Sequence, residues 1–198
     1  MTPQQSRLLT VLGAFAAGIV LCLGVLTLIV GNLSGTGLRT AQIGGPFHLV
    51  DQNGKPVTDQ DLRGKPFLVF FGFTHCPDVC PTTLFDISEV MKSLGPDADR
   101  IGAVFITVDS ERDTVASLKD YLSSFDPHVR ALTGDAAALA AVAKEYRVYY
   151  KKVPLEGGDY TMDHTAIVYL MDKEGHFVSP FSLKRKPEAS AAELRKYL

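Results

Sequence analysis

An uninterrupted apolar run ends beside a pair of cysteines, and this junction constrains the fold more than any other feature of the sequence. The run covers Pro66–Phe73, is rich in Phe and Val, and is too short for a buried helix. It therefore predicts a strand covered on both faces. Cys76 and Cys80 follow, and Pro81 suits a first helical turn, where its missing N–H would have no partner. Both thiols are expected where a buried strand meets a helix N-terminus.

Two thiols at a helix N-terminus indicate either a redox pair or part of a soft-metal site. The unpaired N–H groups and the helix dipole favour thiolates there, so we expect at least one thiol pKa below the free-cysteine value of about 8.5. Residues four apart share a helix face, and thiolates select Cu(I), zinc or iron–sulfur clusters. Structural zinc would need four ligands, and the third cysteine, Cys22, lies in a separate apolar stretch.

A third ligand would have to come from the five histidines, among which His164 stands out. Asp163-His164-Thr165 directly precedes Ala166–Met171, an apolar segment that predicts another strand. Its own surroundings leave His164 open between a ligand and a surface residue at a strand entrance. His75 is expected to be a loop residue despite its position beside Cys76. The remaining histidines are expected to face solvent: His48, His128 and His176.

The N-terminal part of the chain divides into an apolar segment and a Gly-rich linker. Residues 8–30 carry no charge, and a helix of that length, at about 1.5 Å per residue, spans a hydrocarbon core of roughly 30 Å. No Ala-x-Ala site follows, so an uncleaved anchor over residues 1–30 is favoured over a signal peptide. Arg7 favours a cytoplasmic N-terminus. Residues 31–45 predict a flexible linker to a domain over residues 46–198.

Strand and helix patterns alternate through this domain and predict an α/β fold with a mixed sheet. Asn53-Gly54 marks a hairpin within Phe47–Thr58. Further strands are expected at Ile101–Val108, Val129–Leu132, Ala166–Met171 and Phe177–Phe181, with Val148–Val153 extended and Pro154–Tyr160 a loop. Helices are expected over Thr82–Leu94, from a cap at Asp113 or Thr114 to Phe125, from a cap at Asp135 to Tyr146, and after Pro187.

Three motifs together resemble the Sco/SenC/PrrC family. They are GFTHCPDVCPTTL around the cysteines, TVDSERDT at Thr107–Thr114 and DHTAIVYLMD at Asp163–Asp172, and the similarity extends from about Ile43 to the C-terminus. The resemblance implies a thioredoxin-like fold with helices flanking the mixed sheet. It also implies that this fold brings the distal histidine beside the thiols, in a copper site with three ligands: Cys76, Cys80 and His164.

The same resemblance implies a membrane-anchored copper chaperone rather than an enzyme. Such a protein delivers copper to, or prepares, the dinuclear copper site of cytochrome c oxidase. The expected metal is Cu(I), with Cu(II) as a second state, and the expected partners are the copper-bearing oxidase subunit, other copper chaperones or thiol reductants. The anchor would contact lipid and place the domain on the periplasmic or exoplasmic side of the inner or plasma membrane. A net charge of −2 gives no reason to expect nucleic-acid binding.

Two alternative functions use the same cysteines. A thiol–disulfide oxidoreductase would cycle Cys76 and Cys80 through a redox-active disulfide, although their spacing is one residue longer than the C-x-x-C of thioredoxin-type enzymes. A thiol peroxidase would need an activating Thr and Arg, and Arg112 is the only nearby Arg candidate.

Several neighbours of the predicted site remain open between two roles. Asp163 either orients the imidazole or belongs to a turn, whereas Met162 is expected to pack rather than to approach copper. The charged segment Asp109–Asp113 is either a docking loop or a capped, solvated turn. Tyr149–Lys152 is either an edge strand or a docking patch.

Overall fold

The computed structural model describes residues 18–25, 27 and 43–198, in two compact units, Met1–Ala41 and Gln42–Leu198. In the first unit, residues 18–25 and 27 are helical. Among the described residues, no helix combines the length and apolar character needed to cross a membrane. The rest of the predicted anchor and nearly all of the predicted linker lie outside the described residues.

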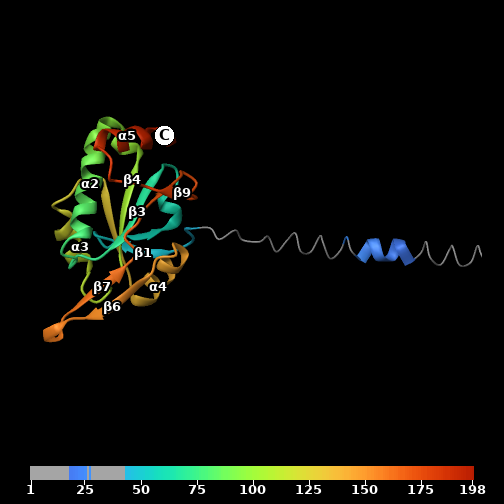
Figure 1. Ribbon diagram of the computed structural model, residues 1–198, viewed down its shortest axis with the longest axis horizontal. Coiled ribbons are helices and arrows are strands. Elements are labelled where there is room, and N and C mark those ends of the chain that lie inside the picture. Colours follow the sequence, from blue (N-terminus) through green and yellow to red (C-terminus); the bar gives the residue numbers. More distant parts are fainter. Residues whose placement is uncertain (1–17, 26, 28–42) are drawn as a thin grey trace, which may run out of the picture. The chain divides into compact units, whose positions relative to one another are not determined.

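The second unit is built on a seven-stranded mixed sheet, as predicted (Figure 1). The strand order is β2-β1-β5-β4-β3-β8-β9. The neighbours β3, β4 and β5 run parallel, and the other pairs are antiparallel. The strands are β1 (His48–Asp51), β2 (Pro56–Thr58), β3 (Phe67–Gly72), β4 (Gly102–Thr107), β5 (Val129–Thr133), β8 (Val168–Met171) and β9 (Phe177–Pro180).

Most of the helices in this unit begin where the sequence provides a capping side chain or a proline at the first position. Thr114 and Asp135 accept a hydrogen bond from the backbone N–H three residues on, at 3.1 and 2.7 Å, and Pro187 stands in the first turn of its helix. The helices are α2 (Val79–Leu94), α3 (Val115–Leu122), α4 (Ala136–Glu145) and α5 (Pro187–Leu194). Short 3-10 turns lie at Asp59–Leu62, Gly95–Arg100, Glu156–Gly158 and Arg195–Tyr197.

Strand β3 is the centre of the core. All six of its residues are buried, and burying one large apolar side chain contributes about 1.5–3 kcal/mol. Its register with β4 places Phe70 beside Phe105 and Gly72 beside Thr107. Because the two strands are parallel, their carboxyl ends meet at one edge of the sheet, and the chain leaves β3 there toward the cysteines.

A separate two-stranded sheet corrects one sequence prediction. Strand β7 (Tyr160–His164) pairs antiparallel with β6 (Tyr150–Pro154), with His164 opposite Tyr150. This hairpin projects from the body of the unit in Figure 1. The expected loop entrance at His164 is therefore the end of a strand, and the next strand begins at Val168 rather than at Ala166. Of the two readings of Tyr149–Lys152, the edge strand is the one observed.

Candidate metal centre

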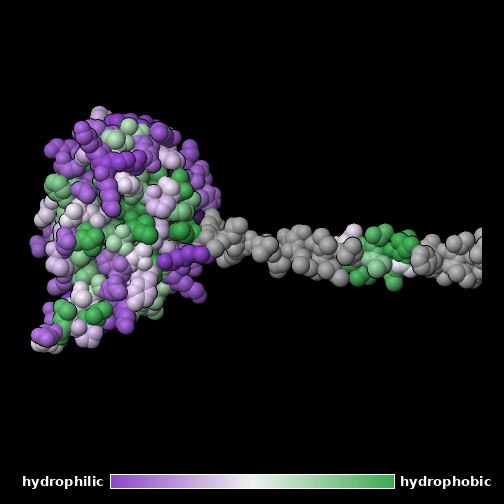
Figure 2. Space-filling model, viewed as in Figure 1, coloured by the Kyte–Doolittle hydropathy of each residue, from purple (hydrophilic) through white to green (hydrophobic). Residues whose placement is uncertain are grey.

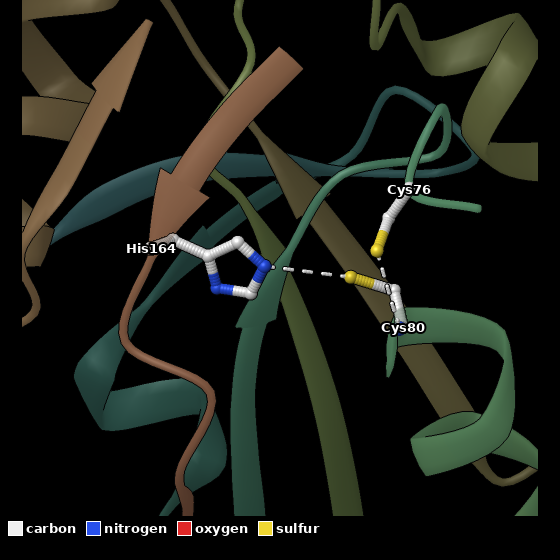
Figure 3. A group of neighbouring side chains, drawn as sticks. All are labelled: Cys76, Cys80 and His164. Carbon is white, nitrogen blue, oxygen red and sulfur yellow. Dashed lines mark hydrogen bonds between the residues drawn. The ribbon is translucent and has the colours of Figure 1, made fainter. Parts of the chain in front are cut away.

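Two sulfurs and one imidazole nitrogen converge at the carboxyl end of β3 (Figure 3). The candidate ligand atoms of Cys76, Cys80 and His164 all lie within 4.8 Å of one another. Cys76 lies in the loop after β3, Cys80 in the first turn of α2, and His164 at the end of β7. The fold thus brings together the three predicted residues, although 84 positions separate Cys80 from His164.

Cys80 is the inner member of the group. Its side chain is fully buried, and its sulfur lies so close to β3 that a Cβ on Gly72 would approach it to 2.7 Å. Burial raises the pKa of the Cys80 thiol well above its ordinary value, with further contributions from the neighbouring Cys76. Cys80 is therefore not the thiol with a lowered pKa that was expected of at least one member of the pair, and that expectation stays a prediction.

Cys76 is the outer thiol and occupies the helix N-terminus instead. It is half-buried, and its sulfur accepts the backbone N–H of Cys80 at 3.4 Å. The loop that carries it is closed by a hydrogen bond from the Cys76 N–H to the Phe73 carbonyl at 3.3 Å. Helix α2 begins at Val79, three residues before the predicted start at Thr82. This earlier start gives Cys76 an unpaired N–H to bind.

His164 is oriented by the backbone next to it. Its Nδ1 lies 3.2 Å from the Thr165 carbonyl, and because a carbonyl only accepts, Nδ1 must donate its proton. In the neutral ring Nε2 then carries a lone pair, and it faces the Cys80 sulfur at 3.6 Å. Burial lowers the pKa of the imidazole and favours this neutral form. Phe73 packs edge-on against the ring, with centroids 5.8 Å apart.

The other candidate residues lie outside this group. Asp163 is exposed, and the Thr165 carbonyl takes the orienting position that had been considered for it. Met162 is buried in the core, as predicted. His75 is an exposed loop residue, as predicted, with its Nδ1 3.0 Å from the Thr74 hydroxyl. His48 and His176 are exposed, as predicted.

His128 and the charged segment differ from expectation. His128 is half-buried rather than solvent-facing. Its imidazole lies 2.6 Å from Asp126 and 3.0 Å from Asp99, and hydrogen bonding to these carboxylates raises its pKa. In the charged segment, Asp109 and Asp113 are only 2% and 1% exposed. The solvated turn is therefore wrong at these two residues. Asp113 accepts from Thr74, 39 positions away, and Asp109 accepts from Tyr160, 51 positions away, as well as from the nearby Arg112. The distant partners could not be read from the local sequence.

The contact between Gly72 and Cys80 gives a test of the packing around the inner thiol. In Gly72→Ala the new Cβ would meet the Cys80 sulfur and the Phe105 ring, both at 2.7 Å. Overpacking of this kind costs about 1–3 kcal/mol. We expect a lower free energy of unfolding in urea, together with faster alkylation of Cys80 by a thiol reagent, read by mass spectrometry, because its sulfur is pushed outward.

Gly102→Ala is the matched control for this variant. Its Cβ would lie 2.9 Å from Phe67 Cβ and would crowd the same pair of strands at their other end. It should reduce stability without changing Cys80 labelling. Wild-type stability and wild-type Cys80 labelling in Gly72→Ala would contradict the packing described here.

Comparison with known proteins identifies relatives over most of the chain. A family model described as SCO1/SenC matches residues 35–198. A solved structure of ScoI from Bradyrhizobium japonicum, described with copper bound, is 66% identical, with a TM-score of 0.78. The match covers 79% of this chain and 99% of that one. The likeness therefore includes both the cysteine loop and the histidine hairpin.

Two curated relatives are longer proteins. The mitochondrial SCO1 homolog 1 of Arabidopsis thaliana is 44% identical over 142 residues, which is 70% of this chain and 42% of the relative. The mitochondrial SCO2 homolog of Mus musculus is 39% identical over 165 residues, which is 81% of this chain and 65% of the relative. The matched regions thus span less than two thirds of the length of these relatives.

Proposed function

Because the chain belongs to the SCO1/SenC family, we propose that it is a copper-binding factor for the assembly of cytochrome c oxidase. The observation that carries the proposal is the convergence of Cys76, Cys80 and His164 within 4.8 Å. Thiolate sulfur selects soft cations such as Cu(I), and imidazole suits copper in both oxidation states. The copper in the 66% identical ScoI structure supports the same assignment.

The donor set fits a cargo metal better than a structural one. A structural zinc site is closed by four ligands, whereas the group found among the described residues has three. Three donors leave room for a fourth ligand supplied by a partner. Nε2 of His164 holds a free lone pair, because Nδ1 is bonded to a backbone carbonyl. Loading has to displace the proton of Cys80, since burial keeps that thiol protonated.

The unequal burial of the ligands indicates the order in which they would release copper to a partner. Cys80 is fully buried, and the other two ligands are half-buried. A ligand from the copper-bearing oxidase subunit would therefore approach from the side of Cys76 and His164. It would displace one of these first, and the released thiolate or imidazole would be free to take up a proton. Cys80 would release the metal last.

The test is an anaerobic titration of the full chain with Cu(I), in a Cys22→Ser background that removes the unrelated exposed thiol. We expect one equivalent of Cu(I) to bind in competition with a chromophoric chelator such as bicinchoninate. Absence of binding would overturn the proposal. So would binding that is unaffected when both Cys76 and Cys80 are replaced by serine.

The second candidate function is thiol–disulfide exchange with a partner protein. It is favoured by the half-buried Cys76 sulfur, which accepts a helix N–H close to Cys80. The Cys76 thiolate would attack a partner disulfide and release one partner thiolate. Cys80 would then attack the mixed disulfide, release the second thiolate and leave an oxidised Cys76–Cys80 pair. Turnover of a disulfide substrate by the metal-free protein distinguishes this activity from copper binding alone.

A thiol peroxidase receives less support from the surroundings of the thiols. Arg112, the candidate activating residue, donates from Nε to Asp109 at 2.6 Å and from Nη1 to the Tyr160 carbonyl at 2.9 Å. These two donors are therefore committed away from the cysteines.

The proposed organisation keeps residues 1–30 as an uncleaved membrane anchor and residues 31–45 as a linker, with the domain of residues 46–198 outside the cytoplasm. The uncharged run of residues 8–30 supports it. The described helical segment also supports it, and most of this segment is coloured hydrophobic in Figure 2. Its exposed apolar side chains are Ile19, Val20, Leu21, Leu23 and Val25.

We expect the full chain to stay in the membrane fraction after a carbonate wash, with the apolar run still present when the mature N-terminus is sequenced. A variant with Leu21→Lys and Leu23→Lys should move to the soluble fraction, because lysine at the centre of a spanning helix costs about 2.5–3.5 kcal/mol. A wild-type chain that begins after Val30 and is soluble would reject the anchor.

A further inference from the structure

We infer that the segment Asp109–Asp113, between β4 and α3, is a brace that fixes two parts of the proposed site relative to each other. The cysteine half is the loop and helical turn with Cys76 and Cys80, and the histidine half is strand β7 with His164. Its aspartate and arginine side chains bond to the two parts of the fold that carry the ligands. They contact the ligands only indirectly, so they are positioning residues. The inference rests on the metal site proposed above, and it assigns a positioning role to residues other than the three proposed ligands.

Asp113 holds the cysteine half. Its side chain is fully buried and accepts three hydrogen bonds. The Thr74 backbone N–H donates at 3.0 Å and the Thr74 hydroxyl at 2.6 Å. The Thr107 hydroxyl, at the end of β4, donates at 2.5 Å. Thr74 stands two residues before Cys76, so Asp113 fixes the backbone from which the outer thiol emerges. A buried carboxylate needs such donors, and losing them is costly.

Asp109 and Arg112 hold the histidine half. Arg112 donates to Asp109 through Nε at 2.6 Å and to the Tyr160 carbonyl through Nη1 at 2.9 Å. Its guanidinium lies over the Tyr160 ring, 3.6 Å from the centroid, and the Tyr160 hydroxyl donates to Asp109 at 2.9 Å. Tyr160 is the first residue of β7 and His164 is the last. The brace therefore holds the first residue of the strand whose last residue carries the imidazole.

Thr107 joins the two halves of the brace. Its hydroxyl donates to Asp113 and accepts the backbone N–H of Asp109 at 3.0 Å. The Arg112 guanidinium also lies 5.9 Å from the Phe73 ring centroid, and Phe73 packs against His164. These contacts make one connected network from the cysteine loop to β7.

The hairpin depends on contacts with the rest of the unit, such as the burial of Met162 in the core and this brace, because it does not belong to the main sheet. Within the described part of the chain, β7 pairs only with β6, and an isolated two-stranded hairpin is marginally stable in water. The thiols, in contrast, lie in the loop and the first helical turn that follow the buried strand β3. Side chains that orient metal ligands typically contribute about 10- to 100-fold in affinity, and this network has the position to do so.

The first experiment is a double-mutant cycle between Arg112→Gln and His164→Ala, in the full chain with Cys22→Ser. Cu(I) affinity is measured anaerobically by competition with bicinchoninate. If Arg112 acts through His164, Arg112→Gln lowers affinity about 10- to 100-fold alone and less than about twofold when His164 is already alanine. Equal losses in both backgrounds would overturn this half of the inference. Tyr160→Phe removes the hydroxyl bond to Asp109 but keeps the stacked ring, so its loss of affinity should be smaller than that of Arg112→Gln.

The second experiment treats the cysteine half in the same way. Asp113→Asn should lower Cu(I) affinity about 10- to 100-fold, and this loss should persist in the His164→Ala background, because it arises at Cys76. If Asp113→Asn does not fold, Thr74→Val removes only the hydroxyl bond, and Thr74→Ser restores it. Wild-type affinity in both Asp113→Asn and Thr74→Val would overturn this half.

Matched controls come from an ion pair away from the site. Arg130 lies 3.4 Å from the buried Asp51 in the β1–β5 region. Arg130→Gln and Asp51→Asn should lower stability and leave Cu(I) affinity unchanged. If these controls weaken Cu(I) binding as much as Arg112→Gln does, the brace has no specific role.

A measurement without metal separates the brace from the proposed function. In the metal-free protein the His164 ring protons sense the edge-on Phe73 ring. Arg112→Gln should shift their NMR signals, and Arg130→Gln should not. If wild-type protein fails to bind Cu(I) but Arg112→Gln still shifts the His164 signals, the copper assignment is rejected and the brace stands. If wild-type protein binds Cu(I) but Arg112→Gln neither shifts the His164 signals nor couples to His164→Ala, the brace is rejected and the copper assignment stands.

Discussion

Cys80→Ser is expected to reduce tight Cu(I) binding from one equivalent to none. The variant removes one of only two thiolates, and a hydroxyl oxygen is a poor ligand for a soft cation. The position is fully buried and packed against Gly72, so the serine hydroxyl would stand where the sulfur does. Cys76→Ser should have the same effect. The measurement is anaerobic Cu(I) titration against bicinchoninate, with the fold checked by circular dichroism.

His164→Ala and Cys22→Ser calibrate this experiment. His164→Ala should weaken binding and still leave a pair of thiols that can be titrated, because Cys80 and Cys76 remain beside each other. Cys22→Ser should bind like wild type. If the Cys76→Ser/Cys80→Ser double variant still takes one equivalent with unchanged affinity, the site is elsewhere.

Oxidation of Cys76 and Cys80 to a disulfide is expected to abolish Cu(I) binding as completely as mutation does. The thiolate is both the metal ligand and the nucleophile, so one disulfide removes both soft ligands. In an exported compartment such oxidation is the ordinary fate of paired thiols. Bound Cu(I) should in turn protect the thiols. The measurement is alkylation of each cysteine against pH, with and without Cu(I), read by mass spectrometry.

Restored reactivity after chelation is the control for this protection. Removing Cu(I) with bicinchoninate should return alkylation to the metal-free rate. Disulfide-containing protein should bind Cu(I) only after reduction. Equal labelling of the loaded and the metal-free chain would rule out redox gating, even if copper binds at another place.

The parts of the fold that depend on local chemistry were predictable from the sequence. The continuous apolar run gave the buried strand β3, Asn53-Gly54 marked the β1–β2 hairpin, and Thr114 and Asp135 each cap a helix. The cysteine pair was equally local, because its spacing and the following proline indicated a helix N-terminus. These features need only the periodicity and capping rules that act over a few residues.

The parts that depend on distant partners were not predictable in the same way. His164 lies 84 positions from Cys80, and only the family resemblance connected them. Strand β7 was missed because its sequence, YTMDH, has a single buried residue, Met162, and therefore no apolar alternation. The burial of Asp113 depends on hydroxyl and amide donors that arrive from Thr74 and Thr107. A charge in the sequence does not reveal whether such donors will meet it.

The placement of the ligands on two parts of the fold, the thiols after strand β3 and the imidazole at the end of β7, has a thermodynamic consequence for the loaded protein. A metal that joins Cys80 to His164 acts as a reversible cross-link across a loop of 84 positions, comparable in reach to a long-range disulfide. A ligand that binds only the folded chain stabilises it by about 2.7 kcal/mol when its free concentration is 100 times its dissociation constant. Copper would thus tie the β6–β7 hairpin to the seven-stranded sheet, and each delivery of the metal would return the donor to a more easily unfolded state.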